Sequence, residues 1–292
     1  EKINKLLGTD IDEKTMLDIF GKLELTYDEA AKTLTVPTFR QDLNCMADLA
    51  EEVARFYGYD KIPMSLPKGE ATVGKKPYSH RIYDIARNIL EGNGFSGGMC
   101  YSFESPKVFD KLLLPADSVY RKAITIANPL GEDFSIMRTV SLNGMLTSLA
   151  TNFNRKNKVA RLYEFGNVYL PKQLPLTELP EERMKLTIGM YGEGDFFNLK
   201  GVIEELFDNL GMKNICTYVP TTEHPFLHPG RQANIVKDDT VVGYLGQLHP
   251  ETCDNYNLKG EVYVAVLDMP NVVALSSFDI KYEGIAKFPG ST

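Results

Sequence analysis

Two neighbouring stretches decide the fold of this chain: Pro37-Thr38-Phe39-Arg40-Gln41-Asp42 and, after five intervening residues, Asp48-Leu49-Ala50-Glu51-Glu52-Val53-Ala54-Arg55-Phe56-Tyr57-Gly58-Tyr59-Asp60-Lys61-Ile62-Pro63. The second stretch predicts a helix from about Asp48 to Tyr57, because Gly58 follows it at the position where helices commonly end and Pro63 comes shortly after. Leu34 to Pro37 predicts a short strand stopped by proline.

Helices are also predicted upstream of these stretches. One is short, contains Ile3 and ends at Gly8, and another runs from about Asp12 to Leu23 with Asp12 as its cap. Its buried side should hold Met16, Leu17, Ile19 and Phe20. Two helices, a strand and a third helix within about sixty residues are typical of a small winged-helix-like module.

Composition bounds the class of protein. The chain has 292 residues, 43% of them hydrophobic and 24% charged, as in ordinary folded proteins. The net charge of −7 argues against a domain that binds nucleic acid by itself, since neutralisation of phosphates by basic side chains supplies most of the affinity for nucleic acid. We expect the chain to be a piece of a longer protein, because it begins at Glu1 and ends on Gly290-Ser291-Thr292.

Cysteine usage indicates a reducing compartment, the cytoplasm. No CxxC pair occurs among the cysteines, which argues against a structural zinc site or a disulfide framework. The sequence also has neither a signal peptide nor an apolar run long enough for a membrane span. The cysteines stand far apart, at Cys45, Cys100, Cys216 and Cys253.

Three segments are predicted: a domain over residues 1–66, a linker over 67–77 that is rich in proline and glycine, and a second domain over 78–292. In the second domain, apolar spacing predicts helices at about 81–91, 141–153 and 198–210. Alternating residues predict strands at 186–190, 240–245 and 261–267. Strands that follow one another without helices indicate an antiparallel sheet with helices on one face, an α+β arrangement.

A glycine pattern imitates a nucleotide-binding motif. Residues 92–97, Gly-Asn-Gly-Phe-Ser-Gly, match GxGxxG, but a dinucleotide fingerprint must follow a strand and open a helix. Here the pattern follows a predicted helix and leads into Met99 to Phe103, which we expect to be a strand. A helix-to-strand turn explains it better.

An acidic cluster is the candidate site. Asp48, Glu51 and Glu52 are spaced so that a helix brings them to one turn, and Asp42 lies just upstream. Clustered carboxylates favour an oxygen-loving cation such as Mg²⁺. Helix capping is the alternative, with Asp48 as cap, Glu51 reaching back to it and Glu51 also pairing with Arg55.

No catalytic constellation accompanies this cluster. His224 and His228 stand four apart, but Pro225 and Pro229 keep them off a common helix, which excludes an HExxH zinc site. The sequence contains neither a GxSxG nucleophile nor a GxxxxGK[ST] phosphate loop.

The two opening stretches resemble the B5 domain of the phenylalanine–tRNA ligase β chain, whose pattern is P-x-x-R-x-D followed by D-L-x-E-E-x-A-R-x-x-G-Y-D-x-I-P. Further strings resemble the same family across nearly the whole chain. They are Asn128-Pro129-Leu130, Ser135-Ile136-Met137-Arg138-Thr139, Arg161-Leu162-Tyr163-Glu164-Phe165-Gly166, Asp195-Phe196-Phe197-Asn198-Leu199-Lys200-Gly201, His228-Pro229-Gly230-Arg231, Gly243-Tyr244-Leu245-Gly246-Gln247-Leu248-His249-Pro250 and Lys287-Phe288-Pro289.

The resemblance implies a non-catalytic role. Residues from about Tyr78 would form a catalytic-like module, a class II synthetase sheet that has lost its active site. The sequence lacks the glycine-rich, arginine-ended segment with which such a site clamps ATP. ATP, phenylalanine and the transfer chemistry would therefore belong to an α subunit, in an (αβ)₂ heterotetramer that attaches phenylalanine to tRNA(Phe). The family also implies Mg²⁺ near the contact with α, bound by Asp42, Asp48, Glu51 and Glu52.

Two other functions compete with this one. A metal-dependent hydrolase could use the acidic cluster, but it would need a second carboxylate group for a two-ion site. A stand-alone winged-helix protein could bind nucleic acid, but the helix over 48–57 carries Glu51 and Glu52 and only one basic residue, Arg55.

Overall fold

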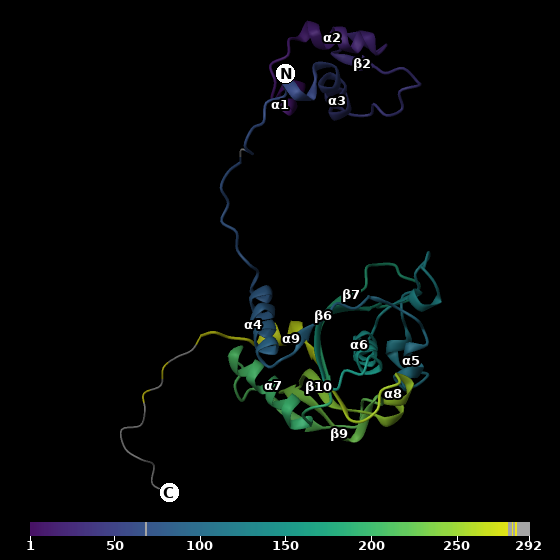
Figure 1. The fold of residues 1–292 in the computed structure, drawn as a ribbon, viewed down its shortest axis with the longest axis vertical. Helices are drawn as coiled ribbons and strands as arrows, with labels where there is room; N and C mark the ends of the chain where they lie inside the picture. Colours follow the sequence, from purple (N-terminus) through teal and green to yellow (C-terminus); the bar gives the residue numbers. More distant parts are fainter. Residues whose placement is uncertain (68, 280–281, 283, 285–292) are drawn as a thin grey trace. The chain divides into compact units, whose positions relative to one another are not determined.

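The computed structural model describes residues 1–67, 69–279, 282 and 284. It divides the chain into two compact units, Glu1–Gly74 and Lys75–Thr292 (Figure 1). Between Ile62 and Pro77 the described residues form no helix or strand. The string Lys287-Phe288-Pro289 lies outside the described residues.

The first unit packs three helices with a two-stranded antiparallel sheet. Its elements are α1 (Lys2–Leu7), α2 (Glu13–Lys22), β1 (Thr26–Asp28), β2 (Thr33–Thr35), α3 (Met46–Tyr57) and a 3₁₀ turn, η1 (Tyr59–Lys61). The core is formed by apolar side chains of all three helices and of the loops between them, including Ile11, Met16, Ile19, Phe20, Leu25, Leu43 and Val53.

The predicted ends of the first two helices are confirmed. Gly8 ends α1 in the left-handed conformation, with φ of 68°, which a residue without a Cβ adopts at no steric cost. Asp12 caps α2, since its side chain accepts a hydrogen bond from the Thr15 N–H at 2.9 Å. The spacing of short polar caps and apolar residues therefore sufficed to place both helices.

The second unit is built around one sheet. Its helices are α4 (Tyr78–Gly92), α5 (Val108–Lys111), α6 (Leu142–Asn154), α7 (Phe196–Asn209), α8 (Pro250–Asn255) and α9 (Met269–Leu275), with 3₁₀ turns η2 (Val119–Arg121) and η3 (Glu132–Phe134). Its strands are β3 (Ser96–Gly97), β4 (Phe103–Glu104), β5 (Ile136–Met137), β6 (Ala160–Leu170), β7 (Glu181–Tyr191), β8 (Thr217–Pro220), β9 (Leu227–Lys237), β10 (Thr240–Leu248) and β11 (Val262–Asp268).

The main sheet has seven strands in the order β3-β6-β7-β11-β10-β9-β8. All neighbouring pairs are antiparallel except β3 and β6, which run parallel, so the sheet is mixed. Strands β4 and β5 form a separate two-stranded sheet. The α+β class is confirmed, and the purely antiparallel sheet is corrected at one edge.

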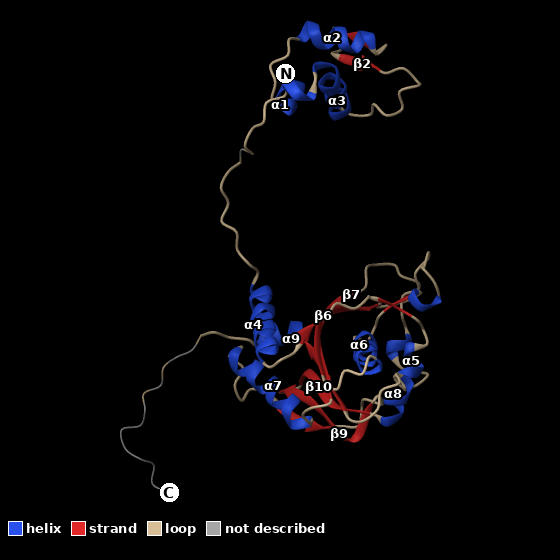
Figure 2. Cartoon of the chain, viewed as in Figure 1, coloured by secondary structure: helices blue, strands red, loops and turns tan. Residues whose placement is uncertain are grey.

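The sheet is covered by helices on both faces, so the prediction of helices on one face was wrong. Helices α4, α7 and α9 pack on one side and α5, α6 and α8 on the other (Figure 2). Strand β11 explains the error, because its side chains are buried on both faces: Val262 and Val264 lie in one core, Tyr263 and Ala265 in the other. A continuous apolar run such as this is typical of a strand buried on both sides.

The glycine-rich turn after α4 confirms one prediction and corrects another. Gly92 is the last residue of α4 and β3 begins at Ser96, so the GxGxxG match is a helix-to-strand turn. The predicted strand from Met99 to Phe103 is largely absent, since only Phe103 lies in a strand. The Cys100 N–H bonds the Glu164 carboxylate at 3.1 Å, where a strand would need a neighbouring backbone.

The remaining helix predictions agree with α4, α6 and α7 to within a few residues. No helix in the described part of the chain is long and apolar enough to cross a membrane.

Candidate functional site

The acidic cluster lies at the start of α3. The helix begins at Met46, two residues before the predicted start, and Cys45 is its N-cap residue with an extended backbone. The predicted cap at Asp48 is therefore wrong. Asp48 is the third helical residue, and in the capping box its side chain accepts a hydrogen bond from the backbone N–H of the N-cap residue.

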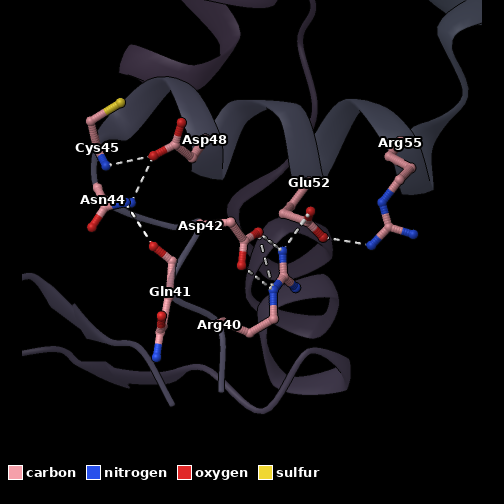
Figure 3. Close-up of polar contacts among 8 residues, drawn as sticks. All are labelled: Arg40, Gln41, Asp42, Asn44, Cys45, Asp48, Glu52 and Arg55. Atoms are coloured by element: carbon pink, nitrogen blue, oxygen red, sulfur yellow. Dashed lines mark hydrogen bonds and ion pairs between the residues drawn. The ribbon is translucent and has the colours of Figure 1, made fainter. Parts of the chain in front are cut away.

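Asp48 satisfies backbone groups at this helix start. Its Oδ2 accepts hydrogen bonds from the N–H of Asn44 at 2.7 Å and of Cys45 at 2.8 Å (Figure 3). These two N–H groups precede the first helical residue and would otherwise be unpaired. Hydrogen bonds from the backbone of Asn44 and then of Cys45 hold the pKa of Asp48 below its usual value.

A guanidinium group, that of Arg40, lies between two of the other three carboxylates, those of Asp42 and Glu52. Arg40 Nε lies 3.0 Å from Asp42 Oδ1, and Arg40 Nη2 lies 2.6 Å from Asp42 Oδ2 and 2.9 Å from Glu52 Oε1. On its other side, Glu52 Oε2 accepts a hydrogen bond from Arg55 Nη2 at 2.6 Å. Figure 3 shows the resulting row of Asp42, Arg40, Glu52 and Arg55, with charges alternating along it.

Burial distinguishes Glu52 from the carboxylate of an ordinary surface ion pair. Glu52 is 7% exposed, whereas Asp42 is exposed. Burial alone raises the pKa of Glu52, but hydrogen bonds from Arg40 and then Arg55 outweigh it, so the pKa is lowered. The hydrogen bond from Arg40 likewise lowers the pKa of Asp42. Both carboxylates are therefore charged at neutral pH and need their cations.

Glu51 stands apart from this network. It is exposed, and among the described residues its carboxylate makes no hydrogen bond or ion pair. The predicted pair between Glu51 and Arg55 is wrong, because Arg55 binds Glu52 three residues before it. Helix geometry allows both spacings, and the buried carboxylate is the stronger acceptor.

As these side chains lie, they do not fit a divalent cation. Mg²⁺ is bound by oxygens at roughly 2.0–2.1 Å and takes one or two carboxylates plus waters. Here Asp42 and Glu52 bind a guanidinium and Asp48 binds backbone N–H groups. In the part of the chain that the structure describes, no group of three or more His, Cys, Asp or Glu residues is placed to hold a metal ion.

A second polar group, in the interior of the larger unit, was missed from the sequence. Arg138 and Glu164 are each 2% exposed, and their Nη1 and Oε1 atoms lie 3.1 Å apart. Arg138 Nε also donates to the Asn167 carbonyl at 2.7 Å. Both residues stand inside strings that resemble the ligase family, and this buried pair is what joins the two strings.

Glu104 lies beside this pair and is 4% exposed. Asn143 Nδ2 donates to its Oε1 at 3.0 Å, and the Tyr256 hydroxyl donates to Asn143 Oδ1 at 2.8 Å. Burial raises the pKa of Glu104 to about 7, with a further rise from Glu164 and an opposing effect of Asn143 and Arg138. The buried Glu104 could not be predicted from sequence, because it lies in the two-residue strand β4, which has no charge pattern.

His224 and His228 do not share a helix, as predicted. His224 lies outside any helix and stacks on Tyr244 with ring centroids 4.1 Å apart, and its Nε2 lies 2.8 Å from Asn234 Oδ1. His228 lies on β9. Burial lowers the pKa of His224.

Comparison with known proteins matches both units. A family model described as "tRNA synthetase B5 domain" matches residues 1–59, and one described as "Phenylalanyl tRNA synthetase beta chain CLM domain" matches residues 62–269. The phenylalanine–tRNA ligase β subunit of Clostridium acetobutylicum is 44% identical over 292 residues, which are 99% of this chain and 37% of that protein.

Two further relatives carry the same name. The β subunit of Clostridium tetani is 42% identical over 98% of this chain and 36% of that protein, and the one from Geobacter metallireducens is 34% identical over 99% and 38%. The chain thus spans little more than a third of the length of these relatives. With the B5 and CLM matches on its two units, the chain belongs to the phenylalanine–tRNA ligase β subunit family.

Proposed function

We propose that this chain is a supporting, non-catalytic part of a phenylalanine–tRNA ligase, and that ATP binding and the transfer of phenylalanine to tRNA(Phe) take place on an α subunit. The observation that carries the proposal is that the arginines on the main sheet contact polar groups of the same chain. A synthetase site needs guanidinium groups free to clamp phosphates.

Each arginine on the strands of the main sheet makes at least one polar contact, although the buried Nε of Arg161 has none among the described residues. Arg161 Nη1 donates to the Asn93 carbonyl at 3.2 Å, and Arg183 Nη2 donates to Asp268 Oδ1 at 2.9 Å. Arg231 Nη1 lies 3.1 Å from Glu261 Oε1. Helices cover both faces of the sheet. A cavity of about 580 Å³ opens onto β9 and β11, and Arg231, which lines it, is paired with Glu261.

The fold assignments extend this proposal. We assign the first unit to the winged-helix type, supported by its three helices and two-stranded sheet. We assign the second unit to an inactive class II synthetase module, supported by a mainly antiparallel sheet with packed helices. The free thiols of the described cysteines agree with work in the cytoplasm.

The contact with the α subunit is proposed at an exposed apolar surface. Met99, Tyr101 and Leu130 are 96%, 74% and 91% exposed, and Phe103 is 40% exposed. The loops that carry them lie side by side, because Phe103 pairs with Met137 and the Tyr101 ring lies 5.6 Å from that of Phe134. Grouped apolar side chains on a surface mark protein contacts. Such contacts would build the (αβ)₂ heterotetramer that binds tRNA(Phe).

Mg²⁺ binding by Asp42, Asp48, Glu51 and Glu52 stays a proposal. It requires a second arrangement of these side chains, in which Arg40 has left Asp42 and Glu52. The metal would then supply positive charge to neighbouring carboxylates and would have no part in the transfer chemistry.

The competing functions are not favoured. A two-ion hydrolase needs a second group of carboxylates, and none is placed to hold a metal among the described residues. A nucleic-acid-binding helix needs basic side chains, whereas α3 carries Arg55 bound to Glu52.

A reconstitution experiment tests the proposal. The chain alone should give ATP–pyrophosphate exchange at background level, and it should co-elute with a cognate α subunit in size-exclusion chromatography. Exchange above background with the purified chain would refute the non-catalytic role. Absence of co-elution would refute the proposed contact.

A surface variant sharpens this test. Tyr101→Ser with Leu130→Ser should weaken binding to the α subunit by at least tenfold in a titration by biolayer interferometry. Leu179→Ser is the matched control, because Leu179 is 89% exposed on the connection between β6 and β7 and is not one of the residues of the proposed surface. Equal affinities for the double variant and the control would place the contact elsewhere.

A further inference from the structure

Two of the four carboxylates expected to bind a metal ion, Asp42 and Glu52, are already paired with arginine side chains of the same chain. Arg40 approaches Asp42 with two nitrogens and Glu52 with one, at 2.6 to 3.2 Å. The Arg40 side chain is 20% exposed, and its guanidinium lies between the carboxylates of Asp42 and Glu52 (Figure 3). A planar guanidinium matches carboxylate geometry and keeps its charge at any physiological pH.

A metal ion and this guanidinium compete for the same oxygens. Coordination at roughly 2.0–2.1 Å would place Mg²⁺ where the Arg40 N–H groups now point. Two like charges would then share one pair of carboxylates, which costs free energy in a partly buried site. Asp48 does not offset this cost, because its carboxylate accepts hydrogen bonds from the N–H groups of Asn44 and Cys45.

We propose that Arg40 is the built-in cation of this carboxylate group, and that Arg40 and a divalent cation exclude each other from Asp42 and Glu52. The inference deepens the metal part of the proposed function and rests on it only for the identity of the cation. A metal ion binds here when Arg40 is drawn away. By linkage, a partner that binds the Arg40 side chain therefore strengthens metal binding, and the metal strengthens that partner's binding.

Mn²⁺ binding to the whole 292-residue chain tests the exclusion. Free Mn²⁺ is quantified by electron paramagnetic resonance as metal is titrated into the wild type and into Arg40→Gln. Arg40→Gln should bind one Mn²⁺ at least tenfold more tightly than the wild type. Adding Glu52→Gln to that variant should abolish the gain, which locates the ion at this cluster.

Arg55→Gln is the matched control. It removes the same charge and also frees an oxygen of Glu52, but it leaves Arg40 between the two carboxylates. Its Mn²⁺ affinity should stay within threefold of the wild type. An equal gain in Arg55→Gln and Arg40→Gln would mean that net charge alone controls binding, and it would overturn the exclusion.

Other outcomes also decide the question. Wild-type binding as tight as that of Arg40→Gln would overturn the proposal, and so would a gain that survives Glu52→Gln. If circular dichroism shows that Arg40→Gln does not fold, Arg40→Lys replaces it, since lysine keeps the charge but lacks the planar fork with which Arg40 approaches Asp42 with two nitrogens. Its affinity should then rise at least threefold, and no rise would overturn the proposal. Subunit association is measured separately, so failure here leaves the reconstitution test intact.

Discussion

Arg138 and Glu164 form an ion pair in which both side chains are 2% exposed, with 3.1 Å between Nη1 and Oε1. The pair joins the segment after β5 to the middle of β6, and Glu164 also accepts the Cys100 N–H at 3.1 Å. One buried carboxylate thus fixes a loop and an arginine that are distant in sequence.

Removing one partner of this pair should strongly destabilise the larger unit. Arg138→Met leaves the buried carboxyl group of Glu164 without its cation, and breaking a buried pair costs about 3–5 kcal/mol of unfolding free energy. Urea unfolding followed by circular dichroism measures it, which suits a chain with no tryptophan. Lys172→Met is the control, because its pair with Glu178 is 67% and 57% exposed and surface pairs contribute about 0–1 kcal/mol. A loss below about 1 kcal/mol in Arg138→Met would contradict the role given to the buried pair.

Gly166 leaves room for the same arginine. A Cβ at this position would lie 1.9 Å from Arg138 Nη2 and 2.9 Å from Glu164 Oε1. Gly166→Ala should therefore force the pair apart and cost about 1–3 kcal/mol, as overpacking does. The comparison is Gly201→Ala on α7, where a Cβ meets nothing within 4 Å and alanine should stabilise by about 0.5–1 kcal/mol. If both substitutions changed the unfolding free energy in the same direction relative to the wild type, space at Gly166 would not be limiting.

Local patterns predicted the helices well because their causes are local. The cap of α2 at Asp12 and the left-handed Gly8 depend on residues within one turn of the helix. The packing of helices on both faces of the main sheet was harder to predict, since alternation along one strand cannot show which helices cover each face. The apolar run in β11 carried that signal, because all its residues are buried.

The acidic site shows the same division between local and distant causes. Spacing correctly placed Asp48, Glu51 and Glu52 on the first turns of one helix. It could not show that Arg40 returns to Glu52, twelve residues away, because that contact depends on how the loop before α3 folds. The pair of Arg138 and Glu164 spans 26 positions and is invisible to any local pattern.

Capping and metal binding predict different effects of substitutions at the start of α3 on the melting temperature. Asp48→Ala should lower the melting temperature of the first unit by several degrees even in EDTA, since two backbone N–H groups lose their acceptor. Glu51→Ala should leave it unchanged, because substitutions at exposed positions without contacts have little effect. Differential scanning calorimetry with EDTA and with Mg²⁺ separates the two roles. Losses of similar size for both variants, seen only with Mg²⁺, would favour metal binding over capping in the isolated chain.

Glu104 should make stability depend on pH in the direction opposite to the paired carboxylates. Burial raises the pKa of Glu104 from 4.5 to about 7, so the folded state binds a proton that the unfolded state has released. Its favourable contribution is complete below about pH 4.5 and is lost as the pH rises through about 7, a difference on the order of 3 kcal/mol.

Glu104→Gln tests this sign, because an amide keeps an acceptor for Asn143 Nδ2 and cannot ionise. Relative to the wild type, the variant should gain unfolding free energy steadily between pH 5 and pH 7 and level off near pH 8, as urea unfolding at each pH would show. Carboxylates with lowered pKa, such as Asp42 and Glu52, titrate in both proteins and cancel in the difference. A difference that is flat across this range would mean that Glu104 is charged in the fold at pH 5, held so by Arg138.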